Sequence, residues 1–266
     1  MRPGSIAMSG GVPVTEDISA GVAHQNQQPH TRPPVRGASS LDMVERAIAV
    51  LEDDEHLNAG YGSNLTLDGT VECDAAIMGA RDASFGSVGA VSGVRNPIRL
   101  ARSILEHARV PDKLGRVPPL TLTSSGAYKF AASRGIDVVP PETLKTAGAE
   151  AQWGKWKARL AEQEAGVGLG DIQDTVGAVA YNSEEGMAAG VSSGGLLLKW
   201  PGRVGEAAIF GAGCWANRIM ACSVSGTGED IIREHIARKI SEMYNEEADP
   251  HKVLDTVLRD FWGTGV

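Results

Sequence analysis

A threonine at the head of an apolar run is the residue in this sequence whose position most suggests chemistry. Thr175 follows Asp174 and precedes residues 176–181, which are rich enough in valine and alanine to form a buried strand. A threonine hydroxyl is a weak nucleophile that needs a base, and no histidine lies in this stretch. Cleavage between Asp174 and Thr175 would free an α-amine with a pKa of roughly 7.7–8.0, which can serve as that base. The pattern therefore predicts a nucleophile that self-cleavage creates.

The segment after this strand predicts a partner for the hydroxyl. Residues 182–186 have the composition of a hairpin turn, and residues 187–191 form a second apolar run. Facing residues of antiparallel strands lie about 4.5–5.5 Å apart, so the returning strand brings Ser192 and Ser193 to the start of the first strand. We expect Thr175 and Ser193 to be hydrogen-bond neighbours.

Four segments around this hairpin resemble the plant-type asparaginase superfamily of N-terminal-nucleophile hydrolases. They are similar to its autocleavage junction, its second active-site loop, its substrate-anchoring loop and the strand that follows: residues 174–177, 192–195, 199–206 and 211–216. Within the superfamily, the aspartate before Thr175, the Ser-Ser-Gly-Gly loop and the Cys-Trp pair at 214–215 are most similar to threonine aspartase (taspase). Taspases are self-processing endopeptidases that cut after aspartate.

The resemblance assigns roles to residues by position. Thr175 would be nucleophile and base, Ser193 would hold it in place, and Arg203 would bind a substrate carboxylate through a bidentate pair. Ser225 and Gly226 would lie near the developing oxyanion.

Three functions remain open from the sequence. The preferred hypothesis is a threonine endopeptidase that is activated by cleavage between Asp174 and Thr175 and cuts protein or peptide substrates after aspartate. The alternative is an asparaginase or isoaspartyl aminopeptidase, because Glu206 stands where the asparaginase branch has an acidic residue that pairs with a substrate α-ammonium. The third is an inactive relative that acts as a binding partner.

Composition excludes several classes of partner. The 266 residues are 42% hydrophobic and 22% charged with a net charge of −8 and no basic block, which argues against nucleic acid. Cys73, Cys214 and Cys222 lack metal-ligand or redox spacing, so we expect no metal and no cofactor. No apolar run approaches the roughly 20 residues of a membrane helix. We expect an intracellular protein, cytoplasmic or nuclear.

The expected fold is α/β, the four-layer αββα sandwich that the resemblance implies, with a homodimer of processed αβ units. Residues 1–38 are predicted to be disordered, residues 39–174 to form an α-subunit-like part that ends in a mobile linker, and residues 175–266 to form a β-subunit-like part. The family's N-terminal Gly-rich motif does not occur, and the family continues for several strands beyond this sequence. We therefore expect a sandwich that is incomplete at both ends.

The sequence also predicts the elements that position Thr175. Helices are expected over 41–51, from Asn96-Pro97 onward, over 125–134, over 231–243 and from Asp249-Pro250 onward, and strands over 72–78, 86–93 and 220–224. The Gly-rich loop 58–65 resembles a family loop that lies under the active site, and residues 140–170 are expected to form a loose, partly helical connector.

Overall fold

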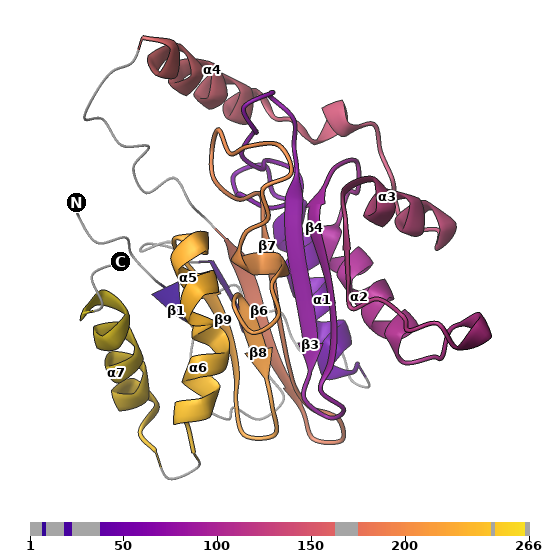
Figure 1. Ribbon diagram of the computed structural model, residues 1–266, viewed down its shortest axis with the longest axis vertical. Coiled ribbons are helices and arrows are strands. Elements are labelled where there is room, and N and C mark those ends of the chain that lie inside the picture. The colour runs from indigo at the N-terminus through magenta and orange to yellow at the C-terminus, as the bar shows by residue number, and fades with distance from the viewer. Residues whose placement is uncertain (1–6, 9–18, 23–37, 163–174, 246–247, 264–266) are drawn as a thin grey trace.

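Two stacked β-sheets lie between two layers of helices in the computed structural model, which describes residues 7–8, 19–22, 38–162, 175–245 and 248–263 (Figure 1). The larger sheet has the order β2 (Ser19–Val22), β6 (Val176–Asn182), β7 (Gly186–Ser193), β3 (Cys73–Gly79), β4 (Ser84–Val91) and β5 (Thr121–Thr123). The smaller sheet has the order β1 (Ala7–Met8), β9 (Ala221–Ser225) and β8 (Cys214–Ala216). This arrangement confirms the predicted αββα sandwich.

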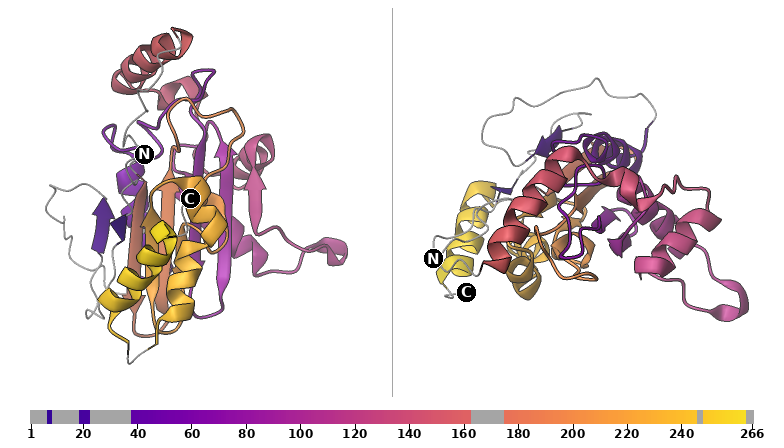
Figure 2. Two further views of the ribbon diagram at one scale, coloured as in Figure 1. Left: turned by 60° about the vertical axis from the view of Figure 1, so that its left-hand side comes forward. Right: turned by 90° about the horizontal axis from the view of Figure 1, so that it is seen from above.

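Each sheet has its own helical layer. The larger sheet packs against α1 (Ser40–Glu52) and α2 (Pro97–Ala108), with α3 (Ser124–Ser133) beside β4. The smaller sheet shares an apolar core with α5 (Gly228–Glu234), α6 (Ile236–Met243) and α7 (Pro250–Gly263), the yellow helices of Figures 1 and 2. Three 3-10 turns join these elements: η1 (Lys113–Gly115), η2 (Pro141–Leu144) and η3 (Glu206–Ala208).

Small residues set the spacing between the layers. A Cβ at Gly86 of β4 would lie 2.3 Å from the carbonyl oxygen of Ala101 in α2, so the helix backbone rests directly on the strand. A Cβ at Gly177 of β6 would lie 2.1 Å from the hydroxyl of Ser223 in β9, where the two sheets meet. These strands are covered on both faces and cannot hold bulky side chains at every position. They therefore contain many glycine, alanine and serine residues.

Two sequence-based expectations need correction. Two short strands, β1 and β2, occur within residues 1–38 and pair with β9 and β6, so the prediction of disorder is wrong at these residues. Backbone pairing along a sheet edge requires no apolar periodicity, which is why composition missed it. The helix expected over 231–243 divides into α5 and α6 at His235, whose φ of 47° is left-handed.

The connector expected over 140–170 contains a full helix, α4 (Ala147–Ala161), which crosses one end of the molecule (Figure 2). Trp153 donates its indole N–H to the carbonyl of Thr66 at 2.8 Å, and Lys157 donates to the carbonyl of Leu67 at 2.7 Å. These contacts dock α4 on the turn after the Gly-rich loop. Residues 163–170 lie outside the described part of the chain.

The buried carboxyl of Glu52 joins three elements at the end of α1. Its Oε1 accepts hydrogen bonds from the Ser192 hydroxyl of β7 at 2.7 Å and from the Ile98 amide of α2 at 2.9 Å. Its Oε2 has no hydrogen-bond partner among the described residues. Complete burial raises the pKa of Glu52 to about 8, so the carboxyl is mostly protonated at neutral pH.

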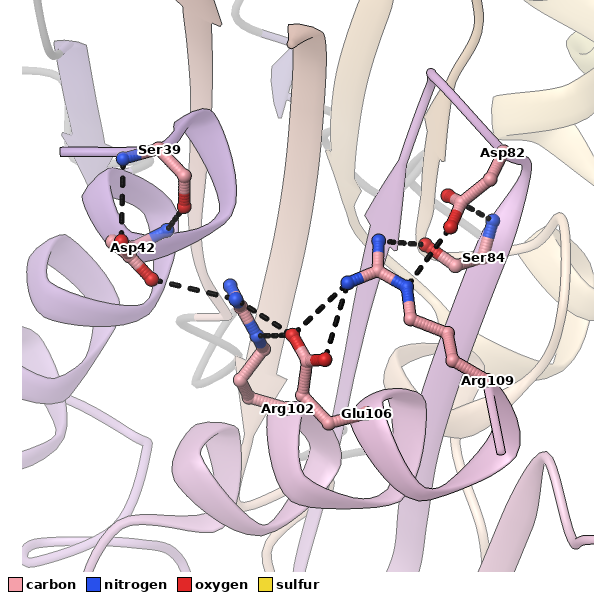
Figure 3. A network of polar contacts seen from close by, with 7 residues as sticks. All are labelled: Ser39, Asp42, Asp82, Ser84, Arg102, Glu106 and Arg109. Atoms are coloured by element: carbon pink, nitrogen blue, oxygen red, sulfur yellow. Dashed lines mark hydrogen bonds and ion pairs between the residues drawn. The ribbon is translucent and has the colours of Figure 1, made fainter. Parts of the chain in front are cut away.

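A second polar network ties the same helices together at the opposite end of β3 and β4 (Figure 3). Arg102 bridges Asp42 of α1 at 3.4 Å and Glu106 at 2.7 Å, and Arg109 joins Glu106 to Asp82 in the β3–β4 turn at 2.9 Å. Partly exposed ion pairs of this kind contribute little each, about 0–1 kcal/mol, so the network fixes orientation more than stability.

Replacement of Gly86 by alanine should lower the free energy of unfolding by about 1–3 kcal/mol, because the new methyl group overlaps the α2 backbone. Gly126→Ala is the matched control: it lies in α3 with no atom within 4 Å of the added Cβ, and it should raise stability by about 0.4–1 kcal/mol. Urea unfolding measures both. Equal effects of the two variants would contradict the close packing of α2 on β4.

Glu52→Gln should remove a pH dependence of stability. The folded pKa of about 8 lies above the ordinary value of 4.5, so the folded state retains a proton that the unfolded state releases. The wild-type chain should therefore lose stability relative to the variant as pH rises from 5 to 8, by about 1.4 kcal/mol per pH unit. Unfolding free energies at several pH values test this, and parallel curves would show that Glu52 does not hold its proton.

Candidate active site

Thr175 lies directly before β6 and is 6% exposed. Antiparallel pairing of β6 with β7 sets Val176 opposite Ser192, so the next residue of β7 reaches Thr175. The Thr175 Oγ1 lies 3.1 Å from the Ser193 Oγ. The contact predicted from the hairpin is confirmed.

Glu206 brings a carboxyl group to the same hydroxyl. Its Oε1 lies 3.1 Å from Thr175 Oγ1, and the side chain is buried in η3. Since the threonine hydroxyl carries one proton, it can donate to Glu206 or to Ser193 at any moment. Burial raises the pKa of Glu206 to about 7 although the nearby Arg203 charge lowers it, so near neutral pH both protonation states are populated.

Arg203 is held by an acidic partner within the chain. Its Nε and Nη2 donate to the two carboxylate oxygens of Glu229 at 2.8 and 2.7 Å. A Cβ at Gly228 would lie 2.5 Å from the Oε2 of Glu206 and 2.6 Å from Nη2 of Arg203, so only glycine lets α5 begin against both groups. Among the described residues no acceptor hydrogen-bonds Nη1, which leaves that nitrogen as the free edge for a further acceptor.

Asp74 fixes the loop that carries Glu206, and sequence reasoning assigned it no role. Its fully buried carboxylate accepts from the amide of Ala90 at 2.7 Å and from the amide of Gly205 at 2.8 Å. Burial raises its pKa, while the neighbouring Lys199 charge and the two amides lower it. The sequence did contain a signal for Asp74, because it is an acidic residue inside an otherwise apolar strand, β3. The register of β3 with β7 sets Asp74 opposite Ser193.

The Gly-rich loop 58–65 contacts the residues that follow Ser193. Asn58 and Asn64 each donate a side-chain N–H to the carbonyl of Gly195 at 2.9 Å. The amide of Gly195 in turn donates to the Ser193 Oγ at 3.0 Å and orients the hydroxyl toward Thr175. A Cβ at Gly194 would lie 2.2 Å from the Asn58 Oδ1, so the Asn58 side chain packs directly against the Gly194 backbone.

The structure does not gather every residue that the resemblance named. Ser225 ends β9 and is buried, and Gly226 follows it, but no described hydrogen bond joins either to Thr175. Asp174 lies outside the described residues, so the expected cleavage junction is described only on its threonine side.

Within the described ranges, no three His, Cys, Asp or Glu side chains cluster as metal ligands would. The same ranges contain no helix with the length and apolar character needed to span a membrane.

The site therefore combines a buried hydroxyl, a carboxyl that titrates near neutrality, and a guanidinium with a free edge. These groups suit acyl transfer to the hydroxyl from a small substrate that carries a carboxylate.

Curated relatives cover most of this chain. It is 40% identical over 203 residues to the isoaspartyl peptidase/L-asparaginase of Rattus norvegicus, covering 76% of this chain and 58% of that protein. It is 40% identical over 206 residues to the protein of the same name from Homo sapiens, covering 76% and 62%. It is 39% identical over 218 residues to the plant-type L-asparaginase of Pyrococcus horikoshii, covering 78% and 67%. The chain thus spans about three fifths of the length of the mammalian relatives it matches.

These names correct the preferred functional hypothesis. An endopeptidase of the taspase kind is wrong, because relatives at about 40% identity are named as isoaspartyl peptidases and asparaginases. The Cys214-Trp215 pair, which favoured it, makes no described contact with the Thr175 hydroxyl, whereas Glu206, which favoured the alternative, contacts it directly.

The asparaginase family matches residues 32–262, nearly the whole chain. Together with the αββα sandwich, this match shows that the chain belongs to the asparaginase family, within the superfamily of N-terminal-nucleophile hydrolases.

Proposed function

We propose that this chain is a threonine-type amidohydrolase that acts on L-asparagine and β-aspartyl peptides. The observation that carries the proposal is the buried Thr175 hydroxyl, which lies 3.1 Å from both Ser193 and Glu206. The names of the relatives support the substrate class.

Self-cleavage before Thr175 would turn this residue into an N-terminal nucleophile. Its free amine takes the hydroxyl proton as Oγ1 attacks the side-chain amide carbon of the substrate. The amine then returns the proton to the leaving nitrogen, which departs as ammonia or as the amine of the next residue. Water hydrolyses the resulting ester, releases aspartate and restores the hydroxyl. Ser193 holds Oγ1 in place through these steps.

Arg203 and Glu206 have the charges needed to bind the α-carboxylate and the α-ammonium of a free amino acid. The free edge of the Arg203 guanidinium would bind the substrate α-carboxylate, while Glu229 keeps the opposite edge in position. The Glu206 carboxylate would accept hydrogen bonds from the α-ammonium. A guanidinium and a carboxylate side by side favour a substrate with a free α-carboxylate and a free α-ammonium. A residue inside a peptide chain has uncharged peptide bonds at both of these positions.

Thr175→Ala should abolish ammonia release from asparagine, because it removes the oxygen that attacks the amide carbon of the substrate. Thr175→Ser keeps the nucleophile and should retain measurable, slower turnover. A coupled ammonia assay on the purified full chain measures both, with isoaspartyl dipeptide hydrolysis as the second substrate. Ammonia release by the alanine variant at the wild-type rate would refute Thr175 as the nucleophile.

Arg203→Lys should raise the KM for asparagine about 10–100-fold and change kcat much less. A lysine cannot pair with Glu229 and a substrate carboxylate through two separate edges, and the lost binding acts on ground state and transition state alike. Arg233→Lys, on the exposed side of α5 in an ion pair with Asp230, is the matched control and should leave KM unchanged. Steady-state kinetics distinguish the two variants, and a normal KM for Arg203→Lys would remove Arg203 from the substrate site.

A further inference from the structure

The uncut chain lacks the base that the mature enzyme would use. While Thr175 is joined to residue 174, its nitrogen is an amide and cannot accept the hydroxyl proton. Self-cleavage nevertheless requires the same hydroxyl to attack the peptide bond that precedes it. Some other group must therefore take that proton during maturation.

We propose that Glu206 is the general base that activates the Thr175 hydroxyl for cleavage of the peptide bond before it. This inference rests on the proposed function, because it assigns a base to the self-cleavage on which that function depends. The carboxyl oxygen and the hydroxyl oxygen lie 3.1 Å apart, within reach for direct proton transfer.

The step balances without a co-reactant other than water. Glu206 removes the proton from Thr175 Oγ1 as the oxygen attacks the carbonyl carbon of residue 174. The carbon–nitrogen bond then breaks, and Glu206 passes the proton to the departing nitrogen, which becomes the α-amine. The product is an ester between residue 174 and Oγ1. Water hydrolyses this ester to a carboxylate and the free hydroxyl.

Other groups near the hydroxyl are already committed. The Ser193 hydroxyl can accept a hydrogen bond, but it is too weak a base to remove a proton from Thr175 at neutral pH. Both carboxylate oxygens of Asp74 accept backbone amides, and both oxygens of Glu229 accept from Arg203. Among the described residues, Glu206 is the titratable side chain in hydrogen-bond contact with Thr175 Oγ1.

The charges around Glu206 match this role. Arg203 favours its ionised form, while burial and the nearby Asp74 carboxylate favour its protonated form, and together they bring its pKa to about 7. A base is most effective when its pKa lies near the working pH. Once the amine exists, that amine becomes the base and Glu206 is released to bind the substrate ammonium, so one carboxyl serves two successive stages.

Glu206→Gln provides the direct test because it keeps the size of the side chain and removes the base. The full chain should be synthesised in a cell-free system, moved into buffers from pH 5 to 9, and followed by denaturing gels and intact-mass measurement. Wild-type cleavage should slow about tenfold per pH unit below pH 7 and level off above it. The Gln variant should cleave at least about 100-fold more slowly at pH 8, since general bases contribute roughly 10²–10⁴-fold.

Two further variants separate chemistry from folding. Glu206→Asp keeps a carboxylate on a shorter side chain and should cleave at an intermediate rate with the wild-type pH dependence. Glu242→Gln removes an equal charge from an exposed ion pair with Arg238 on α6 and should cleave like wild type. Thermal unfolding reports whether each variant is folded.

Each outcome decides the assignment. A folded Gln variant that cleaves at the wild-type rate, or wild-type cleavage that does not slow below pH 7, overturns the role of Glu206 and leaves the proposed function intact. A wild-type chain that stays uncut overturns both. Slow cleavage by the Gln variant together with a retained pH profile in the Asp variant supports Glu206 as the base.

Discussion

The register of three neighbouring strands determines the site. Antiparallel pairing of β6 with β7 brings Thr175 to Ser193, and pairing of β7 with β3 brings Ser193 opposite Asp74. A shift of one residue in either pair would turn these side chains to opposite faces of the sheet. Packing of both faces prevents such a shift, because glycines at the contacts admit only the observed fit of helix and sheet.

The same packing buries several acids. Glu52, Asp74 and Glu206 are all buried, and burial raises the pKa of each. Their environments differ, however. Asp74 accepts hydrogen bonds from two backbone amides. Glu52 holds its proton, and its Oε2 has no hydrogen-bond partner among the described residues. Glu206 lies beside the Thr175 hydroxyl and near the Arg203 guanidinium. Asp74 thus holds a loop in position, Glu52 joins helices to a strand, and Glu206 lies against the Thr175 hydroxyl.

The sequence predicted the strands that position the site, but it did not predict how the charged side chains of the site pair with one another. Continuous apolar runs and hairpin composition are local signals, so the β6–β7 hairpin and the contact of Thr175 with Ser193 could be expected. The pairing of Arg203 with Glu229 joins residues that are distant in the chain, and no local pattern encodes it. Composition indicated a partly helical connector but not where α4 packs, because its docking depends on Trp153 reaching a carbonyl that lies far away in sequence.

The order of the larger sheet has a consequence for what a break before Thr175 would do. Strands from the two sides of that bond alternate, since β6 and β7 lie between β2 and β3. The two pieces would share one hydrogen-bonded ladder and one apolar core, so they would separate only if the whole sandwich unfolded. A chain cut there would behave as a heterodimer whose interface is as extensive as the interior of a protein, and its two polypeptides would have no independent folded state to return to.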